Sequence, residues 1–172
     1  TLGEGVFQIP VGPVHAGIIE PGHFNFAVAG EPILYLQLRM FYKHKGTEKL
    51  FEHIPVSRAV FLAESISGDS AFSHGTAFCQ AVERAAEIEV PPRARYLRVI
   101  WSEFSRVHSH LLWLGLAADA FGFENLFMQA WRARERVLDI IEETTGARVI
   151  FGACKIGGVR KDITDDTLPR IA

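Results

Sequence analysis

ESISGDSAFSHGTAFCQAVE, residues 64–83, leads from small polar residues into an amphipathic helix, and the rest of the chain is organised around it. Phe78, Val82 and Ala86 recur at one-turn spacing, while charged residues take the other side of the helix. This pattern predicts a helix over residues 70–88.

The polar residues at the start of this helix form the first candidate site. Ser67, Ser70 and His74 stand at i, i+3 and i+7, so on one helix they line a single stripe and could meet a common ligand. In a simpler interpretation, Ser67 caps the helix and Asp69 lies favourably near its positive end. The spacing alone leaves both interpretations open.

Composition limits the kind of protein that this can be. Hydrophobic residues make up 48% of the 172 residues, which is high for an isolated domain and predicts a surface covered by partners. A net charge of -2 excludes the basic surface typical of nucleic-acid binding. The longest apolar run, residues 111–121, contains Asp119 and is far shorter than the roughly 20 residues that cross a bilayer. We therefore expect no transmembrane segment and no secretion signal.

The two cysteines and the chain ends indicate the cellular context. Cys79 and Cys154 follow no CxxC spacing, so we expect small buried hydrophobic residues in a reducing compartment and no disulfide framework. The sequence begins at Thr1 without a methionine and ends in LPRIA, shortly after TDDT opens a further helix. Both features favour a piece of a longer protein.

The remaining pattern predicts an α+β fold that is mostly α. Short β-branched and aromatic runs broken by Pro and Gly over residues 5–40 are typical of three or four antiparallel strands. Residues 46–147 follow the helical period, and residues 148–172 indicate a loop and the start of a further helix. We expect one domain over residues 1–172, with the sheet packed on a bundle of long helices. The expected helices cover residues 47–54, 57–66, 70–88, 91–121 and 124–145.

Three other groups stand out along the helical part. Glu103, Arg106 and His110 stack at i, i+3 and i+7, either as a solvated ion pair with a surface histidine or as a contact surface. Arg134 falls on the apolar stripe of the last long helix, where it needs a carboxylate or a stacking aromatic ring, or else extends to solvent. The glycines at 157–158 predict a tight turn.

Six blocks of sequence, taken in order, resemble the core of the nickel-iron hydrogenase large subunit superfamily. More narrowly, they resemble its membrane-complex branch: the large subunits of formate hydrogenlyase-type and energy-converting hydrogenases, and the D-type large subunit of NADH:quinone oxidoreductase, complex I. Together they cover nearly all of residues 10–165, which makes the set more specific than a single motif. The blocks are GPVHAGIIEPGHFNF (12–26), HKGTEKL (44–50), GDSAFSHGTAFCQAVE (68–83), PPRARYLRVIWSEFSRVHSHLLWLG (91–115), WRARERVLDIIEETTGAR (131–148) and IGGVRKDI (156–163).

This resemblance implies a metal site whose ligands have changed. In hydrogenases of this branch the central helix opens with CGxC, whose two thiolates bind nickel, and one of them also bridges to iron. The matching positions here are Ser67 and Ser70, and Ser65 replaces the usual arginine. Because a hydroxyl keeps its proton near neutral pH, it is a poor nickel ligand, and we expect no metal here. The second CxxC of the family lies nearer the C-terminus than this sequence reaches.

The resemblance also implies roles for Glu20 and His15. Glu20 matches the family glutamate that exchanges protons with the metal site, a role suited to a carboxyl with a raised pKa in an apolar pocket. A surface turn residue is the alternative. His15 matches the first histidine of the quinone loop of complex I, whereas Ile18 or Ile19 replaces the second. The quinone-binding tyrosine falls near Gly68, so this chain lacks groups of both branches.

The former ligand region is expected to remain as a polar cavity. His74 matches the histidine beside the second cysteine, and we expect it to act with Glu20 and His15 as the catalytic groups. The expected cavity-lining residues are Ser67, Asp69, Ser70 and His23.

The family pairs this subunit with a small iron-sulfur subunit, in a complex docked on a membrane arm. The resemblance therefore implies a 4Fe-4S cluster in the partner, no cofactor bound by this chain itself, and quinone as the candidate ligand. It also implies a peripheral position on the cytoplasmic, inner face of the cell membrane. The residues expected to contact another subunit are Glu103, Arg106, His110, Gly157, Gly158, Arg160 and Asp162.

The predicted function is electron transfer from the partner's iron-sulfur cluster to a quinone or to a proton-coupled site, without nickel-iron. The chain would act as an oxidoreductase subunit, active only within an NAD-binding NADH:quinone oxidoreductase-like complex or a formate hydrogenlyase-like complex. A non-catalytic scaffold subunit is the alternative. A true nickel-iron hydrogenase is disfavoured, because it needs two thiolates that are missing here.

Overall fold

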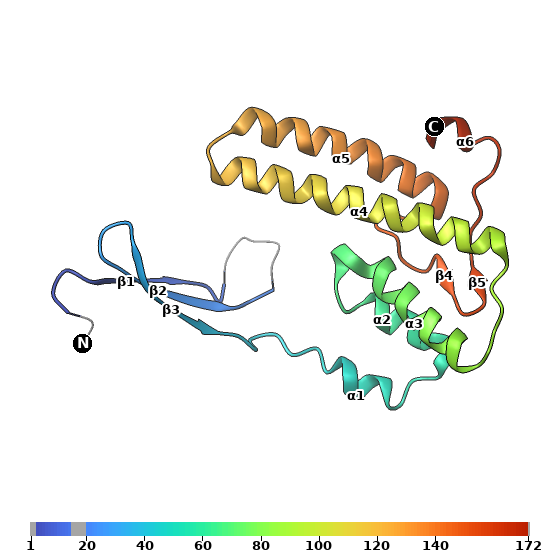
Figure 1. The fold of residues 1–172 in the computed structure, drawn as a ribbon, viewed down its shortest axis with the longest axis horizontal. Coiled ribbons are helices and arrows are strands. Elements are labelled where there is room, and N and C mark those ends of the chain that lie inside the picture. The colour runs from blue at the N-terminus through green and yellow to red at the C-terminus, as the bar shows by residue number, and fades with distance from the viewer. Residues whose placement is uncertain (1–2, 15–19, 172) are drawn as a thin grey trace. The chain divides into compact units, whose positions relative to one another are not determined.

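A computed structural model describes residues 3–14 and 20–171 and divides the chain into two compact units, Thr1–Gly46 and Thr47–Ala172. The first unit holds strands β1 to β3, and the second holds helices α1 to α6 with the short strands β4 and β5 (Figure 1). The sequence pattern predicts one domain over both parts. The division nevertheless coincides with the predicted change from sheet to helices at residue 46.

The first unit is an antiparallel sheet with β2 at its centre. Ile9 on β1 lies opposite Phe26 on β2, and Phe26 lies opposite Leu36 on β3. Since side chains alternate between the two faces of a strand, the large apolar residues of all three strands gather on one face. The predicted sheet is confirmed, with strands β1 Phe7–Val11, β2 His23–Val28 and β3 Ile33–Arg39.

The second unit is built around two long antiparallel helices, α4 and α5, which lie side by side (Figure 1). Helices α2 and α3 pack on each other, and β4 and β5 form a small hairpin that contacts both α3 and α4. The elements are α1 Thr47–Phe51, α2 Val56–Glu64, the 3-10 turn η1 Gly68–Ser70, α3 Ala71–Ala85, α4 Pro92–Ala120, α5 Glu124–Thr145, β4 Cys154–Lys155, β5 Gly158–Val159 and α6 Leu168–Ile171.

Local signals set several helix ends. The helix α5 has the predicted bounds, and it ends at Gly146, whose φ of 84° is the left-handed conformation that glycine adopts without strain. The helix α4 begins at Pro92, where a missing N–H costs no hydrogen bond. The helix α3 is shorter than predicted, because a 3-10 turn precedes it and Glu87 takes a positive φ of 53° soon after its end.

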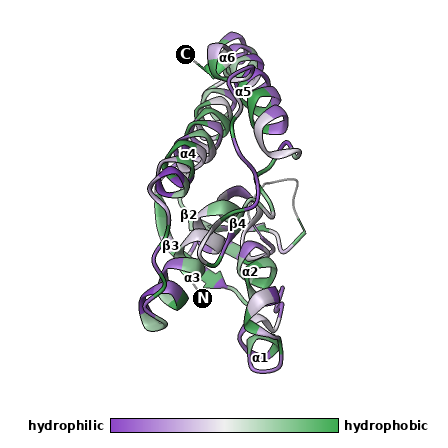
Figure 2. Ribbon diagram, turned by 90° about the vertical axis from the view of Figure 1, so that its right-hand side faces the viewer, coloured by the Kyte–Doolittle hydropathy of each residue, from purple (hydrophilic) through white to green (hydrophobic). Residues whose placement is uncertain are grey.

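The core of the second unit centres on Trp101, which has no exposed surface and meets the Phe72 ring edge-on, with the ring centroids 6.1 Å apart. Hydrophobic and hydrophilic residues alternate around α4 and α5 (Figure 2), as expected for helices buried along one side. The other core residues are Val60, Cys79, Leu97, Leu138, Ile141, Ile150, Ala153, Cys154 and Ile163.

A buried ion pair holds the β4–β5 hairpin to the helices. The Arg98 guanidinium donates to both carboxylate oxygens of Glu83, at 2.9 and 2.6 Å, and to the carbonyl oxygens of Lys155 and Gly158. The Gly157 N–H donates to Glu83 at 2.7 Å, which confirms a tight turn at the paired glycines. Burial acts to raise the pKa of Glu83, but the bonds from Arg98 and Gly157 outweigh burial and lower it.

Within the described residues, each helix is too short or too polar to cross a membrane.

Candidate functional site

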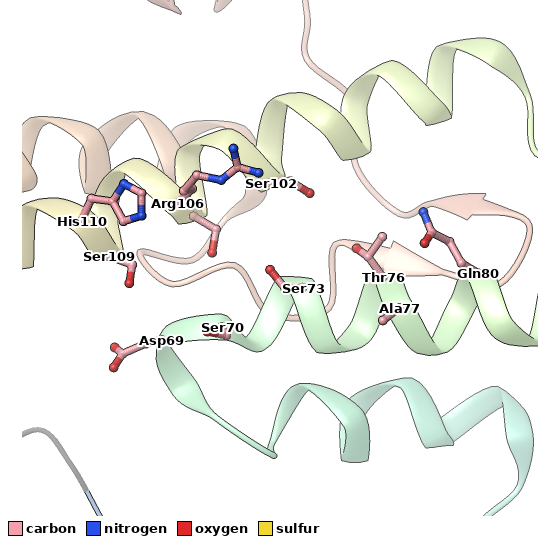
Figure 3. A pocket seen from close by; sticks show the side chains of 11 residues that line it. Asp69, Ser70, Ser73, Thr76, Ala77, Gln80, Ser102, Arg106, Ser109 and His110 are labelled. Carbon is pink, nitrogen blue, oxygen red and sulfur yellow. The ribbon is translucent and has the colours of Figure 1, made fainter. Parts of the chain in front are cut away.

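A polar cleft of about 460 Å³ opens between α3 and α4. Asp69 and Ser70, just before α3, line it together with Arg106 and His110 from α4 (Figure 3). The sequence predicts a cofactor cavity at the first two residues and a contact with another subunit at the other two, whereas the structure brings all four to one place. The other lining residues of this α3–α4 cleft are Ser73, Thr76, Ala77, Gln80, Ser102, Ser105 and Ser109.

The helical period explains which residues line the cleft. On α4, Ser102, Ser105 and Ser109 follow one another at i, i+3 and i+7, and so lie on one face. The opposite wall begins with Ser70 and Ser73, which have the same small hydroxyl side chains. The helical spacing of these serines is visible in the sequence, but no site was predicted from it. Only the packing of α3 near α4 turns the two serine faces into one site.

Positive charge reaches the cleft from Arg106. Its guanidinium lies 3.2 Å from the Glu103 carboxylate, and both side chains are more than half exposed, so the pair constrains Arg106 only weakly. A second hollow of about 370 Å³, lined in part by Arg95 and Arg98, shares Thr76, Gln80, Ser102 and Arg106 with the cleft. Guanidinium and hydroxyl donors together suit a ligand that accepts hydrogen bonds.

Ser67 and His74 do not line this cleft, and the predicted single stripe of Ser67, Ser70 and His74 is wrong. The stripe fails because Ser67 is extended and Ser70 ends the 3-10 turn Gly68–Ser70, so both precede α3, which begins at Ala71. The Ser67 hydroxyl makes no capping hydrogen bond either; the Ser67 carbonyl instead accepts from the Ser70 N–H at 3.3 Å. His74 is half-buried on α3, one residue beyond Ser73 and so about 100° further around the helix.

Glu20 takes the exposed position that the sequence left open as the alternative to an apolar pocket. Its carboxylate forms an ion pair with Lys45 at 2.5 Å, and the Glu20 side chain is 53% exposed. The hydrogen bond from Lys45 lowers the pKa of Glu20, opposite to the shift of a carboxyl in an apolar pocket. His23 begins β2, and its Nδ1 has no hydrogen-bond partner among the described residues. The predicted His15 lies outside the described residues.

Several residues that are expected to contact another subunit have partners inside this chain. The Arg160 guanidinium lies 4.8 Å from the centroid of the Phe61 ring, and Asp162 forms an ion pair with Arg93 at 2.8 Å. Gly158 is buried, and its carbonyl accepts from Arg98. Their contact with another subunit stays a prediction.

Glu64 is a buried carboxyl group that sequence analysis missed. It ends α2 with 1% of its surface exposed, and the Gly152 N–H donates to both carboxylate oxygens, at 3.1 and 2.9 Å. Burial raises the pKa of Glu64, although the bond from Gly152 and the charge of Arg160 oppose the shift. A Cβ at Gly75 would lie 2.8 Å from the Glu64 Cγ, so this glycine provides the space. The burial of Glu64 cannot be predicted from local sequence spacing, because Gly75 and Gly152, which surround its carboxyl group, belong to other segments.

We expect the parent protein to lose stability as pH rises through the mildly acidic range, and we expect this loss to be smaller in Glu64→Gln. Because the folded pKa is raised, the unfolded chain releases this proton first as pH increases. The stability contributed by the protonated form is therefore lost between the unfolded pKa, near 4.5, and the higher folded value. Urea midpoints across this window should decline with pH in the parent and less in Glu64→Gln. The exposed Glu89→Gln is the control, and equal slopes in the parent and in Glu64→Gln would contradict the assignment.

For Arg134 the sequence leaves three outcomes open: a carboxylate partner, a stacking aromatic ring or extension to solvent. In the structure the Arg134 side chain is only 14% exposed, and its guanidinium lies over Trp131, 5.5 Å from the ring centroid. His108 lies in the same part of α4 and α5. His108 is 2% exposed, and neither ring nitrogen has a hydrogen-bond partner among the described residues. Burial lowers the pKa of His108 and Arg134 lowers it further, with Asp69 opposing, so the imidazole is neutral at pH 7.

The donor groups at Ser67 and Ser70 do not fit nickel-iron. Hydroxyls remain protonated where thiolates ionise, and only Ser70 of the two lines the α3–α4 cleft. Over residues 3–14 and 20–171, no three His, Cys, Asp or Glu side chains are grouped so that they could hold a metal ion.

Known proteins match this chain over most of its length, and one family model matches its C-terminal part. The family model described as "Respiratory-chain NADH dehydrogenase, 49 Kd subunit" matches residues 120–172. Formate hydrogenlyase subunit 5 of Escherichia coli (strain K12) is 44% identical over 161 residues, which cover 93% of this chain and 28% of that protein. Membrane-bound hydrogenase subunit alpha of Pyrococcus furiosus is 40% identical over 91% of this chain and 36% of that protein. The C/D subunit of NADH-quinone oxidoreductase from Hydrogenobaculum sp. (strain Y04AAS1) is 39% identical over 91% of this chain and 28% of that protein.

A solved structure supports the same resemblance. A chain of the membrane-bound sulfane sulfur reductase, an archaeal respiratory membrane complex, superimposes with a TM-score of 0.86 and 28% identity. The match covers 95% of this chain and 43% of that chain. These matches confirm the resemblance carried by the six sequence blocks and the predicted fold class. The chain spans between 28 and 36% of the three curated relatives named above.

Proposed function

From its similarity to the membrane-complex branch of the nickel-iron hydrogenase large subunit superfamily, we propose that this chain is part of a large subunit in a membrane-associated redox complex. The relatives are named as subunits of hydrogenase, formate hydrogenlyase and NADH-quinone oxidoreductase complexes. In this proposal the subunit passes electrons from an iron-sulfur cluster in a partner to a quinone or to a proton-coupled site. It lies on the inner, cytoplasmic face of the membrane.

One observation supports the proposal that residues 67–70 do not hold a nickel-iron centre. The family blocks are collinear over nearly the whole chain, yet Ser67 and Ser70 occupy the two positions at which hydrogenases of the branch use thiolates. The α3–α4 cleft that Ser70 lines is instead a polar cavity of hydroxyls and Arg106, whose donors fit a hydrogen-bond-accepting ligand such as a quinone carbonyl. The subunit would bind its redox partner without holding a metal of its own.

Elemental analysis tests this part of the proposal. We expect the full-length protein, purified in its complex, to contain no stoichiometric nickel, because hydroxyl groups do not replace two thiolates as ligands of a soft metal. The iron-sulfur signals of partner subunits should remain. Stoichiometric nickel would overturn the proposal.

A non-catalytic scaffold is the second candidate, and two observations favour it. Glu20 is exposed and paired with Lys45, which lowers its pKa, and His74 is not among the residues that line the cleft. Neither arrangement suits a proton donor at a redox site. In this second proposal, the chain holds neighbouring subunits in place and the chemistry occurs elsewhere.

Turnover of the intact complex separates the two candidates. If the subunit is catalytic, we expect Glu20→Gln and His74→Ala to lower turnover by about 100-fold or more, the usual contribution of a positioned acid or base. Glu31→Gln and His53→Ala are matched controls at exposed positions and should leave turnover unchanged. Parent-like turnover in all four variants would exclude Glu20 and His74 as catalytic groups and favour the scaffold.

A further inference from the structure

An exposed apolar surface lies on the C-terminal half of α4. Trp113, Ala117 and Phe121 follow one another at i, i+4 and i+8, so they share one side of the helix. The exposed fraction is 69% at Trp113 and 88% at Phe121, and Leu114 beside them is 39% exposed. Large apolar side chains that lie together in solvent are unfavourable and mark contact surfaces. We call these four residues the α4 tip surface.

The α4 tip surface continues one wall of the α3–α4 cleft. Arg106 and His110, which line the cleft, stand about two turns and one turn before Trp113 on the same side of α4. Along the cleft, α3 and η1 pack against α4. Beyond His110 the helix continues to the α4–α5 turn, at the opposite end of the helix pair from the β4–β5 hairpin (Figure 1). As far as the described residues reach, this side of α4 is flanked by α3 along the cleft and open to solvent at the tip surface.

The charges around the α4 tip surface have one sign. Residues 111–131 contain two acids, Asp119 and Glu124, and no Lys, Arg or His. Both acids are exposed, and neither forms an ion pair with another described residue. Asp119 also lies in the last turn of α4, where a negative charge opposes the helix dipole. The described part of this chain therefore gives Asp119 no favourable electrostatic partner.

We propose that the α4 tip surface docks another protein subunit, whose contact surface is apolar with Lys or Arg at its rim. The apolar side chains are buried in this contact, and Asp119 and Glu124 pair with the basic rim. A second copy of the same surface would bring like charges together, and anionic lipids would repel both acids. The proposal rests on the proposed function in one respect, since it takes the chain to be a subunit of a larger complex.

Photo-cross-linking in the intact complex identifies what covers the surface. The full-length subunit carries p-benzoylphenylalanine in place of Trp113, assembles in cells, and is irradiated after the complex is purified. We expect an adduct with another subunit, at a segment that includes Lys or Arg. An adduct with a different part of the same large subunit, with a second copy of it or with lipid would overturn the proposal, as would no adduct at all.

These outcomes are distinct from a failure of the proposed function. Each of them leaves the chain a subunit of a redox complex and removes only the docking surface. A full-length subunit that purifies alone, with no other subunit, would instead contradict the proposed function and the docking surface together.

Competition for assembly tests the apolar part of the surface. Parent and variant subunits are expressed together, and mass spectrometry compares their ratio in the purified complex with their ratio in the whole cell. We expect Trp113→Ala to be depleted from the complex about 30-fold, the effect of an aromatic residue at the centre of an interface. Tyr96→Ala is the matched control, because Tyr96 is 73% exposed on the same helix but outside the tip surface. Equal incorporation of the Trp113→Ala and parent subunits would overturn the proposal.

Charge reversal in the same assay tests the basic rim. We expect Asp119→Lys to be depleted about 5-fold, because one attraction at the rim becomes a repulsion. A positive charge in the last turn of α4 suits the helix dipole, so the variant should fold as well as the parent. Glu89→Lys, at an exposed position outside α4, is the control, and equal depletion of the two charge variants would refute the basic rim. Urea midpoints show whether each variant folds, and the cross-link from position 113 decides the proposal if one does not.

Discussion

Replacing Arg98 by methionine should lower the unfolding free energy of the second unit by about 3–5 kcal/mol, the usual cost of leaving one partner of a buried ion pair behind. Both side chains of the Glu83–Arg98 pair are only 6% exposed. In the variant, Glu83 remains buried without its guanidinium, and the Lys155 and Gly158 carbonyls lose their donor. The loss falls on three elements at once, because this pair joins α3, α4 and the β4–β5 hairpin.

Urea unfolding followed by tryptophan fluorescence measures this effect, since all three tryptophans lie in the second unit. Arg93→Met is the matched control. Arg93 also lies near the start of α4 and also pairs with an acid, Asp162, but both side chains are largely exposed, so the loss should be far smaller. Equal shifts of the urea midpoint in Arg93→Met and Arg98→Met would contradict the proposed role of the buried pair.

A double variant refines the same test. Glu83→Gln combined with Arg98→Met removes both charges, so we expect it to recover part of the stability lost in Arg98→Met. The recovery should be incomplete, because Arg98 also donates to the Lys155 and Gly158 carbonyls. A double variant that is no more stable than Arg98→Met would show that the hairpin bonds, and not the buried charge, cause the loss.

Trp101→Ala is the second large expected effect, with a loss of about 3–5 kcal/mol. The indole has no exposed surface and meets the Phe72 ring edge-on, so its removal leaves a cavity at the centre of the core. Residues around it belong to several elements, and they can close such a cavity only in part.

Trp113→Ala on the same helix is the control for this truncation. Its side chain is 69% exposed, and the loss should stay within about 0.5 kcal/mol. Both variants keep two tryptophans, so fluorescence still reports unfolding. If Trp113→Ala costs as much as Trp101→Ala, then the exposed end of α4 contributes to stability in a way that burial does not explain.

Much of the fold could be predicted because its signals are local. The helix α5 has the predicted bounds, since its apolar period and the glycine at 146 both lie within a few residues of the ends that they set. The strands of the first unit follow from alternation and from turn residues in the same way. The Arg134–Trp131 contact was one of three outcomes that the sequence left open, because a one-turn spacing allows the contact but does not exclude extension to solvent.

The candidate site could be predicted only in part. The sequence marks Asp69, Ser70, Arg106 and His110, but for two different surfaces. Their common location depends on the packing of α3 near α4, and no spacing within one helix reports on that. The predicted stripe of Ser67, Ser70 and His74 fails for a smaller reason: a single 3-10 turn changes the direction of side chains that an unbroken helix would align.

The amino-acid sequence by itself determined the secondary structure, the fold class and the family resemblance, because period, caps and collinear motifs are properties of neighbouring residues. Only the tertiary structure decided that Glu64 and the Glu83–Arg98 pair are buried. Both depend on segments that are distant in the chain, Gly152 for Glu64 and the β4–β5 hairpin for the ion pair. Burial and contact are set by how elements pack, and a local pattern does not record which distant element arrives.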